Sequence, residues 1–305
     1  MSKQLKGFSL AFLGAFLFGG EIIALKIGLD IAEPMLIVWL QYLLGSVILF
    51  FYSNAIKSFD LKLIKANFLP MSGSAMLQIL YVLLFSYAVD NLLADVATIF
   101  DPLGDILVIV GGMIFLNERM VKWQKLGLAL SLIGLATFYS ASISYLDTST
   151  LNKGLLLILI AEFAWAGYCL AQKKLTDKVP PCVLNMFTFF IASIIMLPFV
   201  DLNSLTTLNQ TAWLVVGLMT IINVFAFSFF IKSYQYIEAS KVSLIMILSP
   251  IITLGMMYAL LSLDQDLLEL EPLTLRHIMG GILLLVGSGL ASWTYESKSE
   301  NFDKS

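Results

Sequence analysis

The chain has 305 residues, of which 59% are hydrophobic and only 13% charged, and its mean hydropathy is +0.90. A soluble globular domain is nearer to half apolar and a quarter charged, so this composition excludes an ordinary soluble domain and indicates a membrane protein. The net charge of −3 provides no basic surface for nucleic acid. Cys169 and Cys182 are the two cysteines and lack CxxC spacing, so we expect no disulfide framework, metal site or cofactor.

Ten apolar runs are each close to the 20 or so residues that a helix needs to cross a hydrocarbon core of roughly 30 Å. The first run contains Glu21 and lacks a small-residue cleavage site, so we expect a retained span rather than a signal peptide. The sequence therefore predicts an all-α integral membrane protein with ten transmembrane helices. The ten runs are 7–28, 35–53, 68–89, 92–116, 123–143, 154–172, 182–200, 211–231, 241–263 and 276–295.

The basic residues predict the orientation, because cytoplasmic loops carry an excess of lysine and arginine. With the N-terminus placed in the cytoplasm, only Lys26, Lys153 and Arg276 of the 18 basic residues fall outside. We therefore expect a multi-pass protein of a bacterial inner membrane with both termini in the cytoplasm. The basic residues predicted inside are Lys3, Lys6, Lys57, Lys62, Lys65, Arg119, Lys122, Lys125, Lys173, Lys174, Lys178, Lys232, Lys241, Lys298 and Lys304.

The two halves of the chain carry similar marks in the same order. Residues 7–54 align with residues 154–201 at a constant offset of 147, which pairs Lys26 with Lys173. A unit of five spans that starts inside ends outside, so its copy must insert the opposite way. We expect two inverted-topology five-helix repeats and a cytoplasmic tail, with boundaries at 1–145, 152–296 and 297–305.

At this point the chain resembles the drug/metabolite transporter superfamily, and specifically its EamA-like ten-helix members. The resemblance covers essentially the whole chain. Gln41 departs from it, because many relatives carry an arginine at that place in helix 2, and the second copy has an insertion around residues 264–266. The resemblance implies a secondary transporter, not an enzyme, with a central cavity between two five-helix bundles. It rests on residues 14–26 and their echo at 164–173, on 94–112 with Pro102, on Leu116-Asn117-Glu118-Arg119, and on Gly127 and Gly134.

Five acidic residues fall inside the predicted spans, where a carboxylate costs roughly 3 kcal/mol and marks a functional site by default. Three of them share one face of the fourth predicted span, and three from different spans lie at a similar depth. Such an anionic ring would bind a cationic or zwitterionic substrate or carry protons. Pairing with Lys26 or Lys173, or hydrogen bonds between helices, is the structural alternative. The five acids are Glu21, Asp95, Asp101, Asp105 and Glu162.

Other residues of the spans are candidates for lining, bending or packing. Aromatic and amide side chains can stack and donate hydrogen bonds in a cavity, although aromatic residues in spans more often serve in packing or as interface anchors. Prolines remove a backbone donor and can kink a helix, and glycines allow close helix contact within a monomer or a homodimer. The lining candidates are Trp165, Tyr168, Gln78, Tyr81, Asn223 and Tyr234; the kink candidates are Pro102 and Pro250; the packing candidates are Gly127, Gly134, Gly280 and Gly287.

The predicted function is alternating-access transport of a small organic metabolite, such as an amino acid or amine, with proton coupling left open. The partners are that substrate and the lipid bilayer. A lipid-linked sugar translocator and a nucleotide-sugar antiporter are alternatives, although no Gly-rich phosphate loop supports the antiporter. An intramembrane aspartyl protease also needs two buried carboxyl groups and is a remote alternative. Such proteases carry Tyr-Asp, Gly-x-Gly-Asp and Pro-Ala-Leu motifs, whereas here Asp105 follows Pro102-Leu103-Gly104 and neither Tyr-Asp nor Pro-Ala-Leu occurs.

Overall fold

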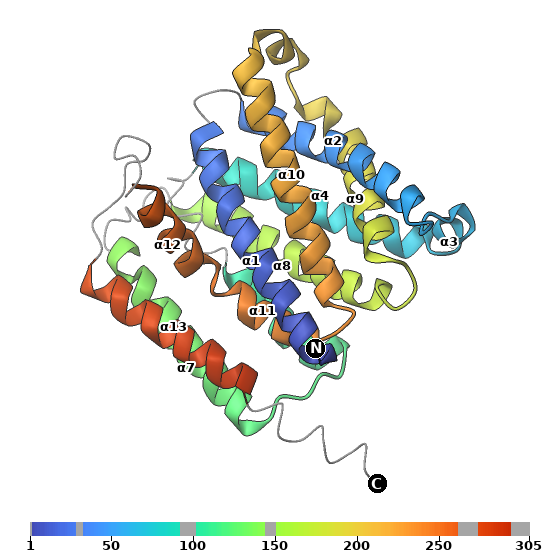
Figure 1. The fold of residues 1–305 in the computed structure, drawn as a ribbon. Helices are drawn as coiled ribbons and strands as arrows, with labels where there is room; N and C mark the ends of the chain where they lie inside the picture. The colour runs from blue at the N-terminus through green and yellow to red at the C-terminus, as the bar shows by residue number, and fades with distance from the viewer. Residues whose placement is uncertain (1, 29–32, 92–101, 144–150, 262–273, 294–305) are drawn as a thin grey trace.

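A computed structural model describes residues 2–28, 33–91, 102–143, 151–261 and 274–293. Within these ranges every regular element is a helix, as Figure 1 shows. The α-helices are α1 (Lys3–Gly28), α2 (Pro34–Ala55), α3 (Leu61–Ala66), α4 (Phe68–Asn91), α6 (Pro102–Phe115), α7 (Lys122–Ile143), α8 (Leu151–Leu175), α9 (Pro181–Met196), α10 (Gln210–Ser233), α11 (Ala239–Met246), α12 (Ser249–Leu261) and α13 (Leu275–Trp293). Two 3₁₀ helices, η1 (Leu197–Phe199) and η2 (Leu202–Thr207), follow α9.

The helices have the length and composition of membrane spans. Seven stretches of the described chain are long and apolar enough to cross a bilayer, and α11 with α12 forms one of them. The helices α6 and α13 are apolar but shorter. The chain is therefore an all-helical, multi-pass membrane protein, while the count of ten spans stays a prediction.

Burial is distributed as a lipid environment requires. Large apolar side chains lie on the outside, including Leu69, 82% exposed, and Leu214, 69% exposed. Polar side chains such as Gln78, Gln172 and Glu162 are at most 1% exposed. Lipid offers polar groups no hydrogen-bond partner, so these side chains lie inside the bundle, where Gln78 donates to Tyr42 and Gln172 to Ser74.

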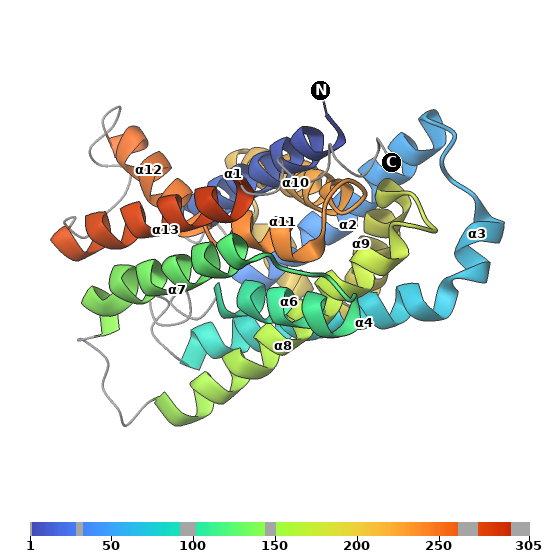
Figure 2. The same cartoon turned by 90° about the horizontal axis from the view of Figure 1, so that it is seen from below.

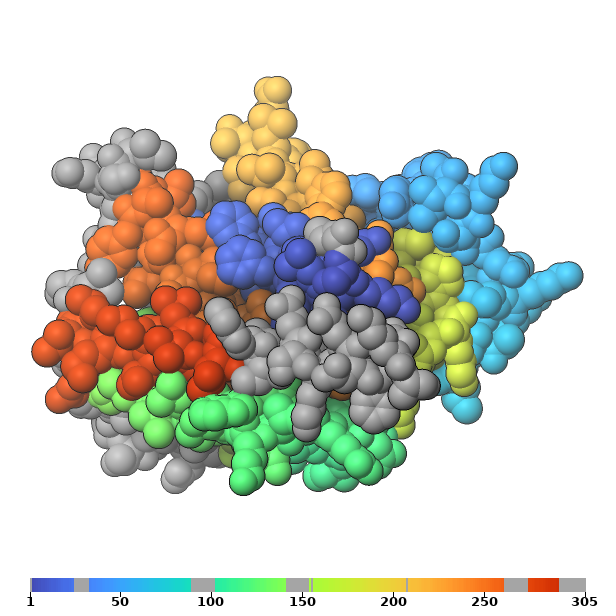
Figure 3. Space-filling model, turned by 60° about the horizontal axis from the view of Figure 1, so that its bottom comes forward, coloured from blue at the N-terminus to red at the C-terminus, as the bar shows by residue number. Residues whose placement is uncertain are grey.

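Helices from the first half of the chain pack against helices from the second half. The helix α1 lies along α10, α4 along α8, α2 along α9, α7 along α13, and α6 against α11. Figure 2 shows α4, α6 and α8 on one side of the bundle and α1, α2 and α10 on the other. In the space-filling view of Figure 3, α1 lies at the surface, bordered by α10 and α12. The core between these layers therefore draws side chains from both halves.

The structure adds one helix that was not predicted and interrupts two of the predicted runs. The short helix α3 was not expected; the Asp60 side chain starts it by accepting a hydrogen bond from the Lys62 amide at 2.8 Å. The run 182–200 leaves α-helix at Met196, because Pro198 cannot donate the next helical hydrogen bond. The run 241–263 divides into α11 and α12 at a turn over residues 247–248.

Candidate functional site

A partly buried polar contact joins both halves of the chain in the C-terminal half of α1. The Oε1 atom of Glu21 accepts hydrogen bonds from Nδ2 of Asn223 on α10, at 2.5 Å, and from Nε2 of Gln41 on α2, at 3.4 Å. The Oε2 atom has no hydrogen-bond partner among the described residues. Two neutral amides thus orient the carboxylate and leave one oxygen able to accept from a ligand.

A cluster of aromatic rings lies deeper between α4, α8 and α10. The Trp165 ring stacks on Phe230, with centroids 5.8 Å apart and planes 11° from parallel. Tyr81 and Tyr168 lie 5.1 and 5.6 Å from the same indole, centroid to centroid. The Tyr234 and Phe230 ring centroids lie 5.1 Å apart. Flat, polarisable faces therefore surround this part of the interior.

Short contacts connect the Glu21 contact to the aromatic cluster. Tyr42 follows Gln41 on α2, and its hydroxyl accepts a hydrogen bond from Nε2 of Gln78 at 3.0 Å. Gln78 is one helical turn before Tyr81 on α4. On the other side, Phe18 packs edge-on against Phe230 at 5.9 Å, one turn before Glu21 on α1. A continuous chain of polar and aromatic side chains therefore runs from Glu21 to Trp165, and we refer to these residues as the candidate lining.

Two of the remaining acids lie at the aromatic cluster. Glu162 is fully buried and Asp105 is 8% exposed. A Cβ atom at Gly104 would overlap Oε2 of Glu162 and lie 2.6 Å from Cδ1 of Trp165. Because Gly104 has no side chain, the side chains of Glu162 and Trp165 can occupy the space beside it. Asp95 and Asp101 lie outside the described residues, so the shared aspartate face and the ring at one depth stay predictions.

The predicted kink and packing residues lie at helix starts and at one helix pair. Pro250 is the second residue of α12, where a missing amide donor costs little, and Pro102 is the first described residue of α6, so the kink predicted there stays a prediction. The four predicted packing glycines meet where α7 contacts α13. A Cβ at Gly134 would lie 2.8 Å from the Gly280 carbonyl oxygen, and one at Gly287 would lie 2.7 Å from that of Gly127.

Several lining residues were not predicted from the sequence. Gln41 was noted only as a departure from the family pattern, and Tyr42, Phe18 and Phe230 were not singled out. A polar residue within an apolar run was the available signal for Gln41. The alternative pairing of Lys173 with a membrane acid is not what the described residues show, because its Nζ donates to the carbonyl oxygens of Tyr234 and Ile237.

The described residues contain no group of three or more His, Cys, Asp or Glu side chains that could hold a metal ion. The lining instead combines carboxylates, amides and aromatic faces. Carboxylates attract ammonium groups, and aromatic faces attract cations and apolar side chains. This combination suits a small organic cation or zwitterion.

Comparison with known proteins gives one family. The model of the EamA-like transporter family matches residues 5–140 and 152–293. A protein of Haemophilus influenzae named an uncharacterized transporter is 24% identical over 83% of this chain and 83% of its own length. An Escherichia coli K12 protein named a probable amino-acid metabolite efflux pump is 24% identical over 91% of this chain and 93% of its own. One solved crystal structure, 15% identical, covers 96% of this chain and all of its own with a TM-score of 0.75, which shows a shared fold.

Proposed function

The chain belongs to the EamA-like transporter family, and from this premise we propose that it moves a small amine or amino acid across the inner membrane by alternating access. The Glu21 contact carries the proposal. A carboxylate inside a membrane bundle is costly unless it is neutralised or used. Glu21 is held by the amides of Gln41 and Asn223 rather than by a cation, so its charge is available to a substrate ammonium group.

Alternating access requires two units that can move against each other around a shared site. The packing supports this. In chain order, the helices α1, α2, α4 and α7 of the first half correspond to α8, α9, α10 and α13 of the second. When each helix is replaced by its counterpart, the observed pairs of packed helices are reproduced. The pair of α1 with α10 corresponds to that of α8 with α4, while α2 with α9 and α7 with α13 each correspond to themselves. The Glu21 contact joins the two halves, so a substrate bound there touches both moving units.

The names of relatives favour the cargo class. Proteins of Escherichia coli and Salmonella typhimurium, 24% and 23% identical to this chain, are each named a probable amino-acid metabolite efflux pump. An amino acid has an ammonium group for Glu21 and a side chain for the aromatic faces around Trp165. We therefore propose amino acids and related amines as the first compounds to test.

The test compares Glu21→Gln with Glu33→Gln, an exposed residue at the start of α2 whose side chain caps nothing. Purified wild-type protein is first screened by thermal shift against amines, amino acids and matched anions. Uptake of each stabilising compound into proteoliposomes is then measured by counterflow. A hydrogen bond to a charged group contributes roughly 1.5–3 kcal/mol, so Glu21→Gln is expected to lower transport by tenfold or more.

The control variant Glu33→Gln should transport at the wild-type rate. Wild-type counterflow by correctly folded Glu21→Gln protein would remove Glu21 from the substrate site. Equal thermal stabilisation by the matched anions would contradict the proposed charge preference.

A further inference from the structure

The connection between α10 and α11, residues 234–238, is capped at both ends by charged side chains. The last carbonyls of a helix and the first amides of the next lack partners within the helices. The Nζ atom of Lys173 donates to the carbonyl oxygens of Tyr234 and Ile237, at 2.5 and 2.9 Å. Glu118 accepts from the amides of Ala239 and Ser240, at 2.7 and 2.9 Å. A cation thus lies at a helix C-terminus and an anion at a helix N-terminus, as the helix dipoles favour.

The loop that supplies Glu118 is shaped for this contact. Asn117 has a φ of 55°, in the left-handed region, and the Glu118 amide donates back to the Gly112 carbonyl at 3.1 Å. A Cβ at Gly112 would lie 2.6 Å from Oε2 of Glu118. The loop therefore brings the carboxylate to 9% exposure against α11, which a mobile surface glutamate would not reach.

The same connection is held by both halves of the chain. Glu118 comes from the first half, and Lys173 from the second. A Cβ at Gly7 of α1 would lie 2.7 Å from Ile237 and 2.9 Å from Tyr236, and the Lys6 ammonium lies 4.8 Å from the centre of the Tyr236 ring. Contacts between halves at one end of the bundle, here those made by Glu118 and α1, are those that must separate when a transporter opens at that end. Lys173 holds the shape of the connection from within the second half.

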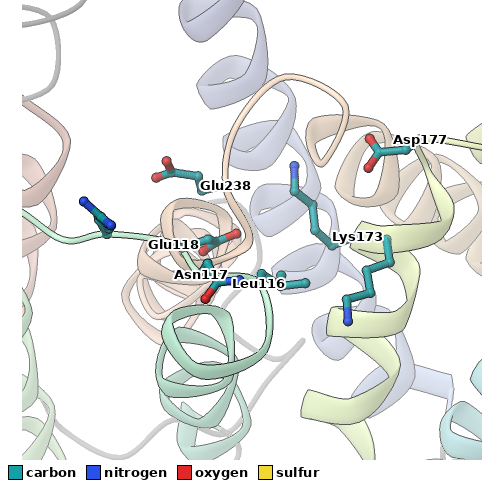
Figure 4. Close-up of a pocket in the computed structure, with 8 residues that line it drawn as sticks. Leu116, Asn117, Glu118, Lys173, Asp177 and Glu238 are labelled. Carbon is teal, nitrogen blue, oxygen red and sulfur yellow. The ribbon is translucent and has the colours of Figure 1, made fainter.

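An open pocket of about 480 Å³ lies beside the capped connection. Figure 4 shows Leu116, Asn117 and Glu118 on one side of it and Lys173 and Asp177 on the other. Cys169, fully buried, is one helical turn before Lys173 on α8, and Trp165 is one turn further. The 234–238 connection reaches both places, because Glu238 lines the pocket and Tyr234 packs against Phe230 of the aromatic cluster.

We propose that Glu118 and Lys173 form an inner gate: they hold the α10–α11 connection closed over the aromatic cluster and release it when the transporter opens to the cytoplasm. The proposal rests on the alternating-access function proposed above. The helix ends and the loop that meet here carry basic residues predicted from the sequence to lie on the cytoplasmic side: Lys6, Arg119, Lys173, Lys174 and Lys241. The structure is then closed on the cytoplasmic side.

Cys169 reports on the gate without any substrate. Cys182→Ser leaves Cys169 as the single thiol of the full-length protein, and its alkylation by a small maleimide is timed in inside-out vesicles. Glu118→Gln and Lys173→Gln each remove a charge-assisted cap, so we expect Cys169 to react about tenfold faster in either variant. The matched controls, Asp177→Asn and Lys174→Gln, change the same charges on exposed residues of the same pocket and should react at the parent rate.

The outcomes separate the gate from the transport function. Parent-like alkylation in folded Glu118→Gln and Lys173→Gln protein, with full reaction after denaturation, overturns the gate. Equally fast alkylation in the two controls also overturns it, since general loosening would then explain the change. Selective acceleration in a protein that transports none of the tested amines or amino acids supports the gate and overturns the proposed cargo. Thermal unfolding of each variant shows whether it folds.

Discussion

The Glu21 carboxylate on α1 accepts a hydrogen bond from the Asn223 amide on α10, so a single contact between two side chains links the two halves of the chain inside the bundle. Glu21 and Asn223 were both candidates, because a polar group in an apolar span requires a reason. Their contact joins residues 202 positions apart, so it depends on how α1 packs on α10, which a periodic apolar pattern does not specify. Glu118 and Lys173 were noted at most for sequence pattern, charge sidedness or acid pairing, and their capping contacts depend on the same packing.

The substitution Gly104→Ala tests whether the space beside Glu162 and Trp165 is needed. In Gly104→Ala the new methyl group would displace Glu162 and Trp165. Overpacking of this kind typically costs about 1–3 kcal/mol, and the displaced side chains lie in the proposed substrate lining. We expect a lower melting temperature and impaired transport, measured by thermal unfolding in detergent and by counterflow.

The control for this prediction is Gly73→Ala on α4, where a new Cβ meets no atom within 4 Å. Removing a helical glycine there should be neutral or slightly stabilising. Equal stability and transport in the two alanine variants would show that the space at Gly104 has no role.

Helices were predicted more accurately than their interruptions. The run 7–28 corresponds to α1 and the run 35–53 to α2 within a few residues, because long apolar segments have few alternatives in lipid. The break between α11 and α12 was not predicted, although Pro250 was noted as a kink. The helix α3 was missed because six residues in a polar loop give too short a pattern.

The pair α7 and α13 gives a prediction at the scale of elements. In Gly280→Ala the new Cβ would clash with the backbone nitrogen of Phe138 and lie 2.7 Å from the Gly134 carbonyl oxygen. Backbone atoms cannot rotate away, so the two helices must separate. We expect destabilisation of about 1–3 kcal/mol, measured as a fall in melting temperature.

Gly289→Ala on the same helix is the matched control, because no atom lies within 4 Å of its new Cβ. It should unfold at or slightly above the wild-type temperature. If Gly280→Ala is as stable as Gly289→Ala, close packing of α7 on α13 does not contribute to stability.

At the scale of the whole molecule, the offset of 147 between the halves and the exchange of their packing partners are both what the proposed inverted repeat predicts. Two copies of a unit with an odd number of spans must insert in opposite directions, and their helices then pack about a pseudo-two-fold axis in the membrane plane. The sequence suggested the copies, but the pairing of α1 with α10 and of α4 with α8 required the structure. Orientation in the membrane follows only from charge.

The inverted arrangement predicts the side of each chain end. An even number of spans, made of two odd units, places both termini on one face and the connection around residue 147 on the other, and the excess of basic residues assigns the face of the termini to the cytoplasm. Fusions of a reporter that is active only in the cytoplasm, made at either terminus, should be active, whereas the same reporter inserted at residue 147 should be inactive. A reporter active only outside provides the reciprocal control. Termini on opposite faces would require an odd total of spans. An odd total cannot be divided into two repeats of equal span number, so an inverted repeat would not explain the symmetry of the helix packing.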